Sequence, residues 1–187
     1  MSFVCLYVDN SNIFLEGRRF ARKHKHENRN DLRVYFRNFL TLIVQGRPLR
    51  EAVWGGSVPP RNDAVWDYLR KQSIEPDLIP RASTGEHETI DYRLQLLMHR
   101  HVREYRQTPG IIALATGDGK GYDKKEGFLY DVEGFVSDGW QLEIYSWSHS
   151  CSRALRSFAE GNGKFIKLDE YYDQITFIKN WRVVNSL

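Results

Sequence analysis

The sequence predicts an α/β protein, a three-layer α/β/α sandwich with a mainly parallel central sheet. Short apolar runs alternate along the chain with longer stretches in which apolar residues recur at helical spacing. Strands separated by helices favour parallel pairing, because each helix carries the chain back across the sheet. A length of 187 residues without internal repeats or low-complexity linkers is typical of one domain, so we expect a single domain over residues 1–187.

The first expected strand lies in the segment Phe3 to Phe14. Its first half, Phe-Val-Cys-Leu-Tyr-Val, is apolar and too short for a helix, which indicates a strand buried on both faces. Four polar turn-forming residues, Asp9 to Asn12, follow it. Further strands are expected at Leu49–Gly55, Pro76–Pro80, Ile111–Ala115, Trp140–Trp147 and Phe165–Leu168.

Helices are expected between these strands, where apolar residues recur three or four positions apart. Ile13–His26 would carry basic residues on its outer face, and Asp31 would cap a helix over Leu32–Val44 that ends at Gly46 and Pro48. The remaining helices are expected at Arg61–Gln72, Thr89–Tyr105, Tyr122–Ser137 and Ser152–Phe158, with Glu170–Ile178 as a terminal helix or loop.

The composition is that of a globular protein, with 41% hydrophobic and 27% charged residues. No apolar run approaches the roughly 18 to 20 residues of a membrane span, and the chain does not begin with a signal sequence. Cys5 and Cys151 lack metal-ligand spacing and are expected as reduced thiols. We therefore expect a soluble, cytoplasmic protein with no membrane partner.

Positive charge is concentrated in one segment. Residues 18–37 contain eight Lys or Arg against two acids, whereas the net charge of the whole chain is only +3. Such a segment is typical of a surface that binds a polyanion, and a solvated helix face has the same composition. The candidate nucleic-acid-binding residues are Arg18, Arg19, Arg22, Lys23, Lys25 and, in a later turn, Lys120.

Three aspartates fall near the carboxyl ends of expected strands, where open α/β sheets bind ligands. Asp9 follows the first strand, Asp118 follows the fourth, and Asp91 lies in the first turn of the helix after the third. Clustered carboxylates raise one another's pKa, and Mg²⁺ or Mn²⁺ relieves that cost because these ions prefer oxygen ligands. Singly, each aspartate is also explained as a helix cap or by the helix dipole. Together they indicate a metal site suited to phosphodiester hydrolysis, with Asn12 as a positioning group.

Four motifs accompany the expected strands: VDNSN after the first, GGSVPP after the second, GEHETIDYRL leading the helix after the third, and ALATGDG at the fourth. Together they resemble the NYN domain, a branch of the PIN-like ribonuclease superfamily. The resemblance covers roughly Phe3 to Leu168. It implies a Rossmann-like PIN fold, a divalent-metal site and endonucleolytic cleavage of RNA. By motif match, Asp9, Asn12, Asp91 and Asp118 would be the site residues, with the three aspartates as metal ligands.

The chain departs from this family at one position. Related domains usually have TGDxD, and Lys120 stands where the second acid would be. Asp123, from a longer turn, is a candidate catalytic replacement, and Glu86 and Glu88 are further acids near Asp91. The alternative is a catalytically weakened PIN-like module that binds RNA or a partner without cutting it.

Two other chemistries fit the sequence less well. Gly117, Gly119 and Gly121 match neither GxGxxG nor a P-loop, which disfavours a nucleotide-binding loop. The pairs His24/His26 and His99/His101 are two residues apart on expected helices and do not share a face, which disfavours zinc.

In the binding-module alternative, exposed aromatics such as Tyr122 or Trp147 would stack on unpaired bases. The sequence leaves open the choice between RNA and DNA, between single-stranded and structured RNA, and whether the chain forms a homodimer.

Overall fold

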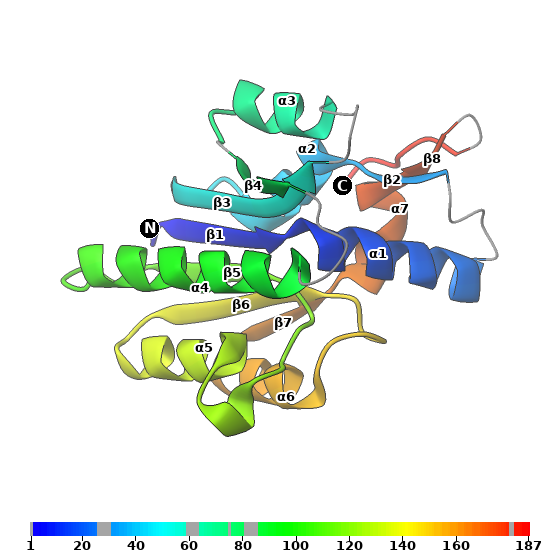
Figure 1. Ribbon diagram of the computed structural model, residues 1–187. Coiled ribbons are helices and arrows are strands. Elements are labelled where there is room, and N and C mark those ends of the chain that lie inside the picture. The colour runs from blue at the N-terminus through cyan, green and yellow to red at the C-terminus, as the bar shows by residue number, and fades with distance from the viewer. Residues whose placement is uncertain (1, 26–30, 59–63, 75, 81–85, 180–181) are drawn as a thin grey trace.

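Figure 1 shows a computed structural model of the chain, which describes residues 2–25, 31–58, 64–74, 76–80, 86–179 and 182–187. The side chains of residues 58, 64, 65, 80 and 86–88 are not described. A parallel sheet of six strands has the spatial order β4-β3-β1-β5-β6-β7. Its strands are β1 (Val4–Asp9), β3 (Leu49–Val58), β4 (Pro76–Pro80), β5 (Ile111–Ala115), β6 (Gln141–Ser146) and β7 (Lys164–Lys167).

Helices cover both faces of this sheet (Figure 1), which confirms the predicted three-layer sandwich. One face carries α1 (Asn10–Phe20), α2 (Phe36–Val44), α3 (Ala64–Lys71) and α7 (Tyr172–Ile175). The other carries α4 (Glu86–Glu104), α5 (Gly127–Ser137) and α6 (Arg153–Asn162). A hydrophobic core lies on each face of the sheet, and β1 contributes to both. Leu6 and Val8 pack into the first core, and Cys5 and Tyr7 pack into the second. The expected burial of this strand on both faces is confirmed.

The order of the strands reverses between β1 and β5. From β1 the chain builds outward through β3 to β4, and then returns to place β5 on the other side of β1. Asp9 pairs with Gly55 of β3, while Val8 pairs with Ala115 of β5. Such a switch point opens a crevice at the carboxyl ends of the strands. The residues that follow β1 and β5 therefore meet where a ligand would bind.

β3 is longer than predicted, because the strand, which was expected to end at Gly55, continues through Gly56 and Ser57 to Val58. A Cβ on Gly55 would lie 2.8 Å from Ile90 Cγ2 of α4, and one on Gly56 would lie 2.3 Å from the Trp66 ring of α3. Helices on both faces thus approach the strand too closely for any side chain. The glycines are therefore needed for close packing. The sequence alone does not tell such glycines from glycines that form a turn.

The N-terminal third differs most from the prediction. α1 begins at Asn10 and continues into a π-helical turn, Ala21–Lys25; the predicted end at His26 lies outside the described residues. Leu32–Val34 is a strand, β2, that pairs antiparallel with β8 (Thr176–Ile178). The prediction of a helix from Leu32, with Asp31 as its cap, was therefore wrong. Leu32 and Val34 are buried and Arg33 is exposed, which is the alternation of a strand, but its partner, β8, lies far along the chain.

The later elements follow the prediction closely. β4 and β5 have the predicted bounds. The stretch predicted as one helix over Tyr122–Ser137 consists of a 3₁₀ turn, Tyr122–Lys124, followed by α5. Another 3₁₀ turn, Leu168–Tyr171, precedes α7 in the terminal segment. The predicted helix start at Arg61 lies outside the described residues.

Both cysteines are free thiols, as predicted. Burial raises the pKa of Cys5 to about 12 and that of Cys151 to about 11, so both thiols are protonated at neutral pH. No helix in the described part of the chain is both long and apolar enough to cross a membrane.

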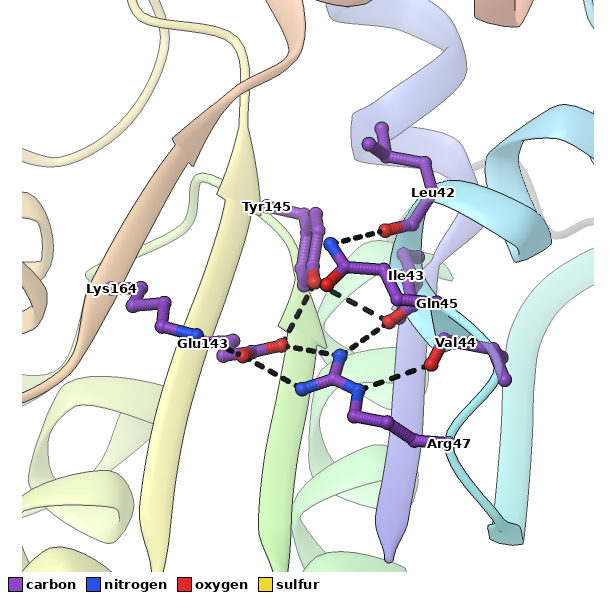
Figure 2. Close-up of polar contacts among 8 residues, drawn as sticks. All are labelled: Leu42, Ile43, Val44, Gln45, Arg47, Glu143, Tyr145 and Lys164. Atoms are coloured by element: carbon purple, nitrogen blue, oxygen red, sulfur yellow. Dashed lines mark hydrogen bonds and ion pairs between the residues drawn. The ribbon is translucent and has the colours of Figure 1, made fainter. Parts of the chain in front are cut away.

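A charged network joins α2 to the far half of the sheet (Figure 2). The Arg47 guanidinium forms two hydrogen bonds of 2.8 Å to the buried carboxylate of Glu143 on β6, and its Nε donates to Val44 O at the end of α2. Lys164 and the Tyr145 hydroxyl also donate to Glu143. Burial opposes ionisation of Glu143, but these hydrogen bonds outweigh it and lower the pKa of the carboxyl.

We predict that Arg47→Met lowers the free energy of unfolding by about 3–5 kcal/mol, because it leaves the Glu143 charge buried with fewer partners. Since the pKa of Glu143 is lowered in the folded state, its contribution to stability is present at neutral pH and is lost as the pH falls below the ordinary value of about 4.5. Urea titrations between pH 7 and pH 3 measure both effects. The double variant Arg47→Met, Glu143→Leu is the control, and it should recover part of the lost free energy of unfolding. No recovery would show that the unpaired Glu143 charge is not the cause of the loss.

Candidate functional site

Asp9 lies at the carboxyl end of β1 with only 5% of its surface exposed. Its Oδ1 accepts a hydrogen bond of 3.0 Å from the Asn12 N–H and so caps α1. Its Oδ2 accepts from the Thr116 hydroxyl at 3.3 Å. Asp9 is therefore a helix cap, which is the role that the sequence also allowed for a single aspartate here. It is also linked to the turn after β5.

The turn after β5 is linked to β1 and α1 at two points. Thr116, fully buried, donates to Asp9 and accepts from the Asp118 N–H at 3.2 Å, so a single hydroxyl connects the two aspartates. The Gly117 N–H donates to Asn12 Oδ1 at 3.0 Å. Asp9, Asn12 and Asp118 are thus brought to one edge, as their positions after β1 and β5 predicted.

The loop between β6 and α6 holds this turn from the other side. Ser152 N–H donates to Gly117 O at 2.9 Å, and Trp147 Nε1 donates to Ile13 O of α1 at 2.9 Å. A Cβ on Gly119 would lie 2.2 Å from Ser152 Oγ, so the turn requires glycine at that position. Three segments that are distant in sequence therefore pack around the ends of β1 and β5.

Asp118 is partly exposed, and Lys120 covers one side of it. The Lys120 N–H donates to Asp118 Oδ1 at 2.9 Å, and Lys120 Nζ lies 3.7 Å from Oδ2. The Lys120 side chain itself is 91% exposed and so can move away at little cost. Lys120, which stands where the resemblance to NYN domains leads us to expect a second acid, thus places a positive charge beside Asp118.

Asp91 lies on the second turn of α4, because the helix begins at Glu86 and not at the predicted Thr89. The helix-dipole explanation, which needs the first turn, is therefore weaker than expected. Its neighbour Ile90 approaches Gly55, the register partner of Asp9. This contact places Asp91 near the same edge of the sheet.

The aspartates do not form a closed cluster. Among the described residues, no three His, Cys, Asp or Glu side chains lie close enough to hold a metal ion together. Asp123, in the 3₁₀ turn Tyr122–Lys124, is exposed and joins no such group, and the side chains of Glu86 and Glu88 are outside the described residues. Mg²⁺ is nevertheless often held by one or two carboxylates together with waters and substrate phosphate. Asp9 and Asp118 fit that smaller donor set.

The predicted basic helix extends past the ends of the strands (Figure 1). Arg19 forms an ion pair with Glu16, and Lys25 pairs with Asp173 at 3.2 Å. Arg18 lies over the Phe14 ring, 5.4 Å from its centroid. Arg22 and Lys23 are exposed in the π-helical turn. The segment therefore keeps exposed positive charge beside the candidate site, although part of it is neutralised locally.

Sequence reasoning missed a cluster on α1. Glu16 lies one helical turn after Asn12, is largely buried, and has its Oε2 3.2 Å from His149 Nε2. The centroid of the His24 ring lies 6.3 Å from that of the His149 ring. These histidines come from different parts of the chain and do not belong to one of the pairs His24/His26 and His99/His101. Trp147 is fully buried, so its predicted role in stacking on bases was wrong, whereas Tyr122 is 42% exposed. The sequence could have shown this cluster only if acidic residues had been considered together with histidines far away in the chain.

Comparison with known proteins identifies the fold. No protein-family model matches the chain, and no curated protein matches it. The crystal structure of a protein of unknown function from Vibrio parahaemolyticus RIMD 2210633 superposes with a TM-score of 0.64 and 16% sequence identity. The match covers 90% of this chain and 94% of that one. The two proteins share a fold. At this identity nothing further transfers, so the function must be argued from the site.

We predict that Thr116→Val lowers the free energy of unfolding by about 1–3 kcal/mol, because the isosteric change removes the buried hydroxyl that donates to Asp9 Oδ2 and accepts from the Asp118 N–H. Thr116→Ser, which keeps the hydroxyl, is the matched control and should cost less. Equilibrium unfolding in urea measures both variants. Equal stability of Thr116→Val and wild type would show that this hydroxyl does not join the two turns.

Proposed function

We propose that the protein is a metal-dependent ribonuclease that hydrolyses phosphodiester bonds of RNA at the carboxyl edge of β1 and β5. The observation that carries the proposal is the connection of Asp9 to Asp118 through Thr116 at the switch point of the sheet. The resemblance of the surrounding motifs to NYN domains supports RNA as the substrate. The two free thiols are compatible with a cytoplasmic protein.

Each residue has a role that its contacts support. Asp9 and Asp118 would hold Mg²⁺ or Mn²⁺, and Asp91 would contribute a further ligand or orient water from α4. Such an ion supplies the Lewis acid that phosphodiester hydrolysis needs. Asn12 directs its amide oxygen to the Gly117 N–H, which leaves its NH₂ group to donate to a phosphate oxygen.

The basic end of α1 would provide affinity for the RNA backbone. Arg22 and Lys23 are exposed, and neither forms an ion pair with an acid among the residues that the structure describes. Phosphates bound by these side chains would lie along the helix that starts at Asp9. An RNA strand held there would pass the candidate metal site.

A second function, binding without cleavage, is favoured by the position of Lys120. Its ammonium lies beside the Asp118 carboxylate and competes with a cation for the same oxygens. The absence of a three-carboxylate group among the described residues points the same way. In this alternative the edge would bind RNA or another partner through Lys120 and α1 without hydrolysing it.

We predict that the wild-type protein cuts a labelled single-stranded RNA in Mn²⁺ or Mg²⁺ and not in EDTA. The double variant Asp9→Asn, Asp118→Asn should lose this cutting, because amides bind these ions poorly. Gel electrophoresis of the RNA after incubation measures the products. Circular dichroism of the double variant serves as the folding control.

Lys120→Asp separates the two candidate functions. If the edge is a weakened nuclease site, an acid at this position should increase metal-dependent cutting, because it replaces a competing charge by an additional ligand. No cutting by wild type or by Lys120→Asp, with RNA binding retained in a gel shift, would contradict the nuclease and support the binding module.

We predict that RNA affinity falls with salt and that Arg22→Gln, Lys23→Gln weakens it. Each lost phosphate contact should reduce the slope of log affinity against log salt by about 0.7 to 0.9. Fluorescence anisotropy at several KCl concentrations measures the slope. Arg70→Gln, Lys71→Gln at the far end of α3 is the matched control and should leave the slope unchanged. An equal slope in both double variants would show that α1 does not bind the backbone.

A further inference from the structure

An open groove of about 680 Å³ separates α4 from α5 on the outer surface of the molecule. The two helices lie on the same face of the sheet (Figure 1). Val102 and Phe135 contribute apolar surface to the groove, and a Cβ on Gly134 would meet nothing within 4 Å. A glycine inside a helix is unfavourable, so this one keeps the groove open at a cost to α5.

Large apolar side chains extend this face along α4. Tyr92 is 57% exposed and Leu96 is 52% exposed. His99 and Arg103 follow at steps of three and four residues, which keeps these four side chains on one side of α4, and Arg106 lies in the turn just after the helix. Across the groove, Tyr130 of α5 is 43% exposed. Exposed apolar residues gathered along one face are typical of an interaction surface.

The two walls of the groove carry opposite charges. Arg103 lies on α4 and Arg106 lies in the turn that follows it, whereas Glu133 lies on α5 and Asp138 at its end. At the base of the groove, Asp131 Oδ1 lies 3.0 Å from His99 Nε2. Asp131 Oδ2 is buried and has no hydrogen-bond partner among the described residues. Burial raises the pKa of Asp131, with His99 opposing the shift.

We propose that this groove lies at a dimer interface, where its two walls pack against the walls of the same groove in a second copy of the chain. Both helices connect parallel strands, so they run in the same direction, and the contact between His99 and Asp131 aligns their levels. A two-fold axis along the groove places α4 of one copy over α5 of the other at the same level. The basic wall of each copy then faces the acidic wall of its partner, and the two-fold axis produces this contact twice.

The charges also distinguish this occupant from nucleic acid. Three carboxylates, those of Asp131, Glu133 and Asp138, contribute to the groove and would repel a phosphate backbone. A second copy instead supplies arginines for these acids and acids for Arg103 and Arg106. Gly134 lets the helices of the two copies approach closely. This proposal does not depend on the nuclease activity.

Complementary charge reversals test the interface. In sedimentation velocity, wild type should show a concentration-dependent mass approaching twice 22.0 kDa. Arg103→Glu, Arg106→Glu makes both walls acidic, and Glu133→Arg, Asp138→Arg makes both basic. Because like charges across an interface cost several kcal/mol, each variant alone should raise the dimer dissociation constant at least about 100-fold. An equimolar mixture of the two variants should dimerise again.

Two further variants exclude trivial explanations. Gly134→Gln should raise the melting temperature of the monomer by improving α5, and should abolish the dimer by placing a side chain where the helices of the two copies approach. Arg70→Glu, Lys71→Glu, on the opposite face of the sheet, should dimerise as wild type does. A monomeric wild type at 100 µM, or a mixture of charge variants that stays monomeric, would overturn the proposal. Loss of RNA binding in the groove variants of a monomeric protein would assign the face to nucleic acid instead.

Discussion

The carboxyl edge of this protein depends on one constraint, a carboxylate at the end of a strand that is buried on both faces. Asp9 is 5% exposed, and a buried acceptor without a partner costs about 1–3 kcal/mol, more when it is charged. The Asn12 N–H and the Thr116 hydroxyl supply the partners. The first fixes the start of α1, and the second fixes the turn after β5. The need to satisfy one carboxylate therefore aligns the two segments that flank the switch point.

The strands of the central sheet could be predicted because their signals are local. Ile111–Ala115 is a continuous apolar run between turn-forming residues, and its bounds were predicted correctly. The continuation of β3 from Gly56 to Val58 was not predicted, since the glycines make room for Ile90 and Trp66, which lie on helices packed against opposite faces of the sheet. A three-residue strand such as β2 is also not recognisable alone, because its pattern fits a helix until β8 is known to lie beside it.

The candidate site could be predicted in position but not in its connections. Strand ends place Asp9 and Asp118 at one edge from sequence alone, because parallel strands share the direction of the chain. The hydroxyl that joins them comes from Thr116, 107 residues from Asp9, and the imidazole beside Glu16 comes from His149, 133 residues away. The first contact depends on the pairing of β1 with β5, and the second on the packing of the β6–α6 loop against α1. The same packing buries Trp147, which its polar neighbours in the sequence had placed at the surface.

α4 connects the two functional proposals. Its N-terminal half brings Asp91 to the carboxyl edge, and its C-terminal half forms the basic wall of the groove. Because α4 and α5 run antiparallel to the strands they connect, a two-fold axis along the groove is also roughly parallel to the sheet. Such an axis keeps the direction of the strands, so the carboxyl edges of both copies would point the same way. The basic ends of two α1 helices would then lie on a common side of the dimer, where one RNA strand could contact both sites and gain affinity without any new contact in either copy.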